Sequence, residues 1–239
     1  MKTKIASVVK YLTALVIPLA LVFIPIFGRN SAGTESGLST WPATLRVLAI
    51  TISLFFVALF YWSDGVLKKD WGAWKQHWGR NILIALGSTV FMYIVLVPIS
   101  KMASQFLAAG STLPVQAYMS INFWQTSLPT LLVMLVPLLQ AFTEEMIYHH
   151  ALIAPFAGKK SLYIVMSIFA NLVFALAHFN NVNGSLPNLV LYFVMGVFFQ
   201  LMFFLSKRNI WQNVMTHLLY NSVITFIGAF GLIVGSLMH

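Results

Sequence analysis

Two adjacent carboxylates, Glu144 and Glu145, lie in an otherwise apolar stretch and are followed by two adjacent imidazoles, His149 and His150. The three other acidic residues of the chain fall in polar segments. An ionisable side chain at membrane depth costs at least about 2.5 kcal/mol, and neighbouring carboxylates also repel each other. Carboxylates and imidazoles can deprotonate water, or bind a zinc ion that activates water. We therefore expect a working site here.

The spacing of the polar residues indicates which of them share a helix face. Residues four positions apart lie on one face of an α-helix. Three such pairs are Glu145 and His149, Phe174 and His178, and His217 and Asn221. Counted at about 1.5 Å per residue from the basic turn at 159–160, Glu144 and His178 lie roughly 20 and 24 Å deep. The two side chains are therefore expected at nearly the same level of the membrane.

The composition is that of an integral membrane protein. Of the 239 residues, 59% are hydrophobic and 8% are charged, whereas soluble domains carry roughly 25% charged residues. Cysteine is absent, which excludes disulfides, thiolate metal ligands and a cysteine nucleophile. The net charge of +9 is concentrated in short basic clusters between apolar runs. This pattern favours lipid headgroups, and not nucleic acid, as the partner of the basic residues.

Apolar runs of bilayer length predict an all-α bundle of seven membrane-spanning helices. The predicted spans are residues 11–27, 44–62, 81–100, 128–157, 161–179, 188–205 and 210–237. Residues 63–80 mix basic residues with tryptophans, which is typical of a segment in the headgroup layer. Residues 101–125 form a more polar connection, with a short amphipathic helix or an eighth short span as alternatives. The first run also has features of a signal peptide, but its length favours an uncleaved span.

The distribution of Lys and Arg predicts the orientation in the cell membrane. With the N-terminus in the cytoplasm, eleven of the 14 basic residues fall on the cytoplasmic side and three on the other, as the positive-inside rule requires. An odd number of spans then puts the C-terminus outside. The polar groups of interest crowd the second half, so we divide this single membrane unit into N-terminal helices, residues 1–124, and a site-bearing part, residues 125–239.

The polar motifs resemble those of the CAAX protease and bacteriocin-processing family, also called CPBP or Abi, which includes the type II CAAX prenyl endopeptidases. The likeness covers about residues 125–237. Its motifs, in order, are Glu144-Glu145 with His149 four residues on, Phe174-x-x-x-His178, and His217-x-x-x-Asn221. The resemblance implies an all-helical intramembrane endopeptidase that cleaves a membrane-associated protein or peptide, in bacteriocin self-immunity or peptide maturation.

The resemblance also implies a role for each residue. Glu144 would be the general base, His178 would position or polarise the water, and His217 and Asn221 would contact the oxyanion or orient the scissile carbonyl. The same chemistry allows a zinc ion held by Glu144, His178 and His217. The residues leave the metal-free and metal-dependent mechanisms open, and the absence of an HExxH motif favours the metal-free one.

Three residues are expected to support the site: Glu145, His149 and Phe174. The family usually has Arg at the position of His149, where it is thought to hold the second glutamate. His149 can pair with Glu145 through the four-residue spacing, but it lacks the planar fork of a guanidinium. We therefore expect lower activity, or none.

Two other functional classes are compatible with the buried glutamates. A transporter or proton channel would use them as carriers, but it predicts an internal repeat with matching polar sites in each half, and the polar groups crowd the second half only. A catalytically silent scaffold or immunity protein would bind a peptide in the same cavity. The His in place of Arg keeps this second alternative open.

Overall fold

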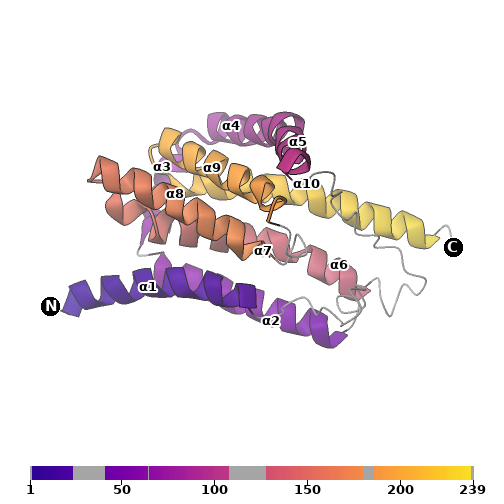
Figure 1. Cartoon of the computed structure of the whole chain (residues 1–239), viewed down its shortest axis with the longest axis horizontal. Helices are drawn as coiled ribbons and strands as arrows, with labels where there is room; N and C mark the ends of the chain where they lie inside the picture. The colour runs from indigo at the N-terminus through magenta and orange to yellow at the C-terminus, as the bar shows by residue number, and fades with distance from the viewer. Residues whose placement is uncertain (1, 24–40, 64, 108–127, 180–185, 238–239) are drawn as a thin grey trace.

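The computed structural model describes residues 2–23, 41–63, 65–107, 128–179 and 186–237 (Figure 1). All regular secondary structure in these ranges is helical. Within them, five helices are long and apolar enough to span a membrane alone, and two shorter apolar helical stretches, Val8–Ala20 and Leu189–Leu205, complete the seven predicted positions. The prediction of an all-α, polytopic membrane bundle is confirmed.

The helices follow the predicted order along the chain. The N-terminal half contains α1 (Lys2–Phe23), α2 (Trp41–Val57) with a π-helical turn (Ala58–Trp62), α3 (Val66–Lys75), α4 (Trp78–Phe91) with a π-helical turn (Met92–Leu96), and α5 (Val97–Leu107). The C-terminal half contains α6 (Leu128–Met134), α7 (Val136–Glu144), the π-helical segment η4 (Glu145–Ala151), the short 3-10 helix η5 (Ala154–Phe156), α8 (Lys160–Ala177), α9 (Leu189–Leu205) and α10 (Ile210–Leu237). The predicted eighth span falls largely in 108–127, outside the described residues.

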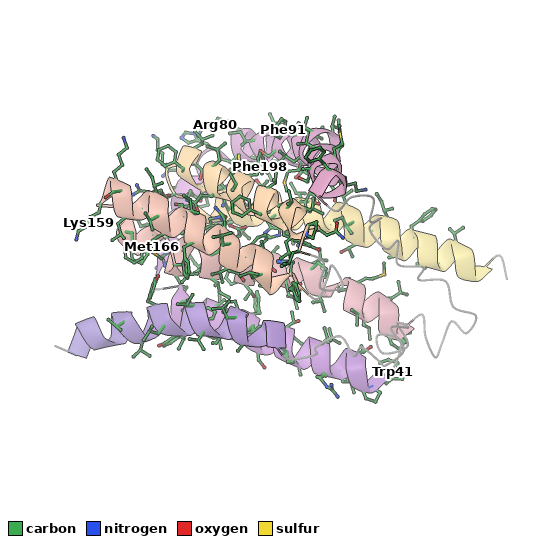
Figure 2. The ribbon with its side chains drawn as sticks, in the orientation of Figure 1. Trp41, Arg80, Phe91, Lys159, Met166 and Phe198 are labelled. Carbon is green, nitrogen blue, oxygen red and sulfur yellow. The ribbon has the colours of Figure 1, made fainter. Side chains whose placement is uncertain are left out.

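The connections between successive membrane helices lie alternately at the two ends of the bundle. Figure 1 shows the N-terminus and the start of α8 at one end, and the C-terminus and the start of α2 at the other. Figure 2 shows Lys159 and Trp41 at these opposite ends. This alternation is the one that the predicted topology needs, while the side of the membrane that each end faces stays a prediction.

The fourth predicted span, 128–157, is not one continuous α-helix. The chain turns at Leu135, between α6 and α7, because Pro137 has no amide hydrogen with which to continue the helical ladder. At this break Thr225 Oγ1 donates to Met134 O over 2.9 Å, and Asn221 Nδ2 donates to Pro137 O over 2.8 Å. Side chains of α10 thus hold the backbone of the broken helix in place.

A second irregularity starts at Glu145, where the α-helix widens into η4. The segment closes with a bond from Leu152 N to Ile147 O over 3.0 Å, five residues back along the chain. Such π-helical turns are rare and frequently lie at functional sites. The change of helix type falls between the two glutamates: Glu144 ends the regular α-helix, and Glu145 begins the wider turn.

The predicted headgroup-layer segment contains α3, which packs on the start of α10. Asp70 is buried, and its Oδ2 accepts a hydrogen bond from Ile210 N over 2.9 Å. Trp74 Nε1 donates to Gln212 Oε1 over 3.1 Å, and Asn209 Nδ2 donates to Asp70 O over 2.9 Å. A carboxylate at the first free amide of a helix also complements the helix dipole. Helix α3 therefore fixes the first turn of α10.

Candidate functional site

Glu144, the last residue of α7, lies between two imidazole rings. Its Oε1 is 3.6 Å from Nε2 of His178, which directly follows α8, and its Oε2 is 3.7 Å from Nε2 of His217 on α10. Both separations exceed a direct hydrogen bond. The side chains of Glu144 and His178 are 15% and 14% exposed, against 3% for His217. The accessible edge of the site is therefore the one formed by Glu144 and His178.

The ring of His178 is held from two sides. Its Nδ1 lies 2.8 Å from Phe174 O. A carbonyl oxygen only accepts, so Nδ1 carries a hydrogen, and Nε2 is the nitrogen that faces Glu144. Tyr192 of α9 stacks on the ring at 4.1 Å between centroids and 20° between planes. The Phe174 ring packs against the same imidazole at 4.6 Å.

The ring of His217 is oriented in the same way by different groups. Its Nδ1 lies 2.9 Å from Glu145 Oε1. A carboxylate oxygen accepts this hydrogen bond, which again leaves Nε2 as the nitrogen that faces Glu144. Phe199 of α9 stacks on the ring at 4.2 Å and 23°. The two histidines therefore present equivalent nitrogens to the two oxygens of one carboxylate.

Glu145 is only 1% exposed and lies behind this pair. The expected pairing with His149 is present, with His149 Nδ1 2.7 Å from Glu145 Oε2, but its direction falls outside hydrogen-bond geometry. The directional hydrogen bond to Oε2 comes from Asn213 Nδ2, over 3.0 Å. Sequence reasoning did not single out Asn213. Its position four residues before His217, on the same face of α10, was the available signal.

The described hydrogen bond of Asn221 is to the backbone of α7 and not to Glu144. The Asn221 amide donates to Pro137 O, seven residues before Glu144, which is about 10 Å along α7. The reason is the direction of the helices: α10 runs antiparallel to α7, so the step from His217 to Asn221 leads toward the start of α7. The four-residue spacing correctly predicts that His217 and Asn221 share a face of α10. It does not predict that they contact the same residue.

The predicted zinc ligands Glu144, His178 and His217 offer the right donor atoms, two imidazole nitrogens and a carboxylate. In the described part of the chain, however, no group of three or more His, Asp or Glu side chains is arranged to hold a metal ion. A metal ion held by these three residues stays a prediction.

Comparison with known proteins adds one finding. Residues 124–223 match the model of a protein family described as type II CAAX prenyl endopeptidase Rce1-like. This part of the chain is therefore similar to that family. The match spans all three motifs, from Glu144 to Asn221, and confirms the family likeness that they carry. No curated protein and no solved structure matches the chain.

Proposed function

We propose that the protein is an intramembrane endopeptidase in which Glu144 activates water to hydrolyse a peptide bond. One observation carries the proposal: the carboxylate of Glu144 lies between His178 Nε2 and His217 Nε2, at 3.6 and 3.7 Å, within the part of the chain that is similar to the Rce1-like family. A general base must lie within reach of the proton that it removes, directly or through one water. The spacing around Glu144 meets this condition.

The first step uses the accessible edge of the site. A water molecule between Glu144 and His178 meets two acceptors, so it donates one hydrogen to each and directs an oxygen lone pair outward. As the water oxygen attacks the scissile carbonyl carbon, Glu144 takes a proton from the water. The electrons of the carbonyl double bond move onto the carbonyl oxygen. Glu144 then returns the proton to the leaving amine as the carbon–nitrogen bond breaks.

The resulting oxyanion needs donors, and we assign this role to His217 and Asn221. His217 Nδ1 already donates to Glu145, so Nε2 donates to an oxyanion only when the ring carries both protons. The two flanking carboxylates provide the charge that such a ring needs. Asn221 lies one turn further along α10 and adds a second donor when a substrate carbonyl replaces Pro137 O as its acceptor.

We assign as substrate a membrane-associated protein or peptide, because the site lies on helices that form membrane spans. Bacteriocin self-immunity or peptide maturation is the cellular role that the family likeness implies. The buried contacts of Glu145 support an active site as opposed to a silent scaffold, because they hold His217 in the orientation that the reaction needs.

The test compares membranes from cells that express the wild type, Glu144→Ala or His178→Ala, at equal protein level, by mass spectrometry of membrane-associated peptides. Ser167→Ala is the matched control, since its hydroxyl on α8 only bonds back to Tyr163 O. We expect a cleaved peptide in the wild type and the control that is lost in both site variants. A product that persists in both variants, or no Glu144-dependent product at all, would overturn the proposal.

A further inference from the structure

We infer that Asn213 is a positioning residue of this site, which holds Glu145 and Phe199 and through them fixes the ring of His217. Its effect on catalysis rests on the proposed function, whereas its effect on the His217 ring does not.

The amide of Asn213 is placed by two acceptors. Asn213 lies in the first turns of α10 and is fully buried, with 0% exposed. Its Nδ2 donates to Glu145 Oε2 over 3.0 Å and to Phe199 O over 2.8 Å. The opposite amide orientation would direct Oδ1 at these same two oxygens, which cannot donate. The amide therefore has one workable orientation, and it links η4, α9 and α10.

Both partners of Asn213 contact the same imidazole. Glu145 Oε1 lies 2.9 Å from His217 Nδ1, at the edge of the ring. The Phe199 ring stacks on its face at 4.2 Å. Asn213 and His217 also share a face of α10, four residues apart. The Asn213 amide thus holds both Glu145, which orients the edge of the His217 ring, and Phe199, which packs on the face of that ring.

The carbonyl oxygen of the Asn213 amide indicates that asparagine stands at this position because of its N–H donors. Asn213 Oδ1 is buried without a hydrogen-bond partner among the described residues. Buried polar atoms without a partner are uncommon and reduce stability. A residue kept at this position for packing alone would be apolar, such as leucine, which has nearly the same shape.

The direct test is 15N NMR of histidine-labelled protein in nanodiscs, with the His217 signals assigned by their loss in His217→Gln. In the wild type, His217 should show a single, well-defined signal for a protonated Nδ1. Asn213→Leu should replace this with mixed or broadened signals, while His178 stays unchanged because Phe174 O holds its Nδ1. Thr216→Val is the matched control: Thr216 is equally buried on α10, and its hydroxyl bonds back to Gln212 O.

The second readout is the yield of the Glu144-dependent peptide. Asn213→Leu should lower it about 10- to 100-fold, the loss expected from a small misplacement of a catalytic group, with Thr216→Val unchanged. If the wild type yields no such peptide, the proposed function fails, and the NMR arm still decides the role of Asn213. Asn213→Ala is measured beside Asn213→Leu, so that one folded variant is available. An unchanged His217 spectrum in a folded variant would overturn the inference.

Discussion

Replacing each of the two adjacent glutamates by glutamine should separate catalysis from stability. Glu145 is 1% exposed and has three polar contacts between 2.7 and 3.0 Å, from His149, His217 and Asn213. Glu144 is 15% exposed, and its contacts with the two histidines are 3.6 and 3.7 Å long. The same substitution therefore removes direct buried contacts at one position and longer contacts at the other.

The expected magnitudes follow from these contacts. A hydrogen bond to a charged group contributes about 1.5–3 kcal/mol. Glutamine at 145 keeps one acceptor oxygen, but its NH2 group must face at least one donor, so we expect a loss of about 2–4 kcal/mol. For a chain of this size that lowers the Tm by roughly 4–16 °C. Glutamine at 144 should change stability by about 0.5 kcal/mol or less, as for most replacements outside tight contacts.

Thermal unfolding of the detergent-solubilised variants, run beside the peptide-cleavage comparison, measures both effects. Glu144→Gln should have the wild-type Tm and no Glu144-dependent product. Glu145→Gln should unfold earlier and also yield little product, because His217 loses its orienting acceptor. Equal Tm values for the two variants, or a Glu145→Gln variant as stable as the wild type, would refute this account of the pair.

Three further predictions address the scaffold and its orientation. Gly196→Ala should lower the unfolding temperature, because the added Cβ would lie 2.7 Å from Asn171 Oδ1. Such overpacking costs about 1–3 kcal/mol, and an unchanged Tm would contradict this prediction. Asp70→Ala removes the acceptor of Ile210 N and should cost about 1 kcal/mol, as lost helix caps do, which thermal unfolding also measures. Because the chain has no cysteine, Lys160→Cys should react with an impermeant maleimide only after the cells are opened, and labelling of intact cells would reverse the predicted topology.

Much of the fold could be predicted because membrane spans depend on local composition. A run of apolar residues long enough to cross the hydrocarbon core is visible without knowledge of its neighbours. The similar depth of Glu144 and His178 could be predicted for a related reason. Their two helices are joined by a short turn, so the depth of each residue can be counted from the same membrane face. Their side chains approach to 3.6 Å in the structure.

Other features depend on packing between helices distant in sequence. The fourth span was predicted without a break, and its sequence does not indicate that Asn221 and Thr225 of α10 pair with the carbonyls at the break before Pro137. The spacing of Asn213 and His217 gave a shared face, but not that Glu145 lies opposite it. Which helices meet, and in which direction they run, determines the partner of each polar group.

The contacts of Glu145 also explain how this carboxylate is held without the usual Arg of the family at position 149. An Arg fork supplies two parallel donors to a carboxylate. Here His217 and Asn213 supply one hydrogen bond to each oxygen, and His149 adds a close electrostatic contact. The replacement therefore does not leave Glu145 without donors.

This arrangement transfers the support of Glu145 from its own helix to α10. Asn213 and His217 lie within the first eight residues of α10, whose first amide is bound by Asp70 of α3. A shift of α10 by one residue would move both donors away from the carboxylate. Helix α3 thus contributes to the site by fixing the start of α10, although it contacts neither glutamate directly in the described contacts. Loosening α3 should therefore disturb His217 before it disturbs His178, whose ring is held by α8 and α9.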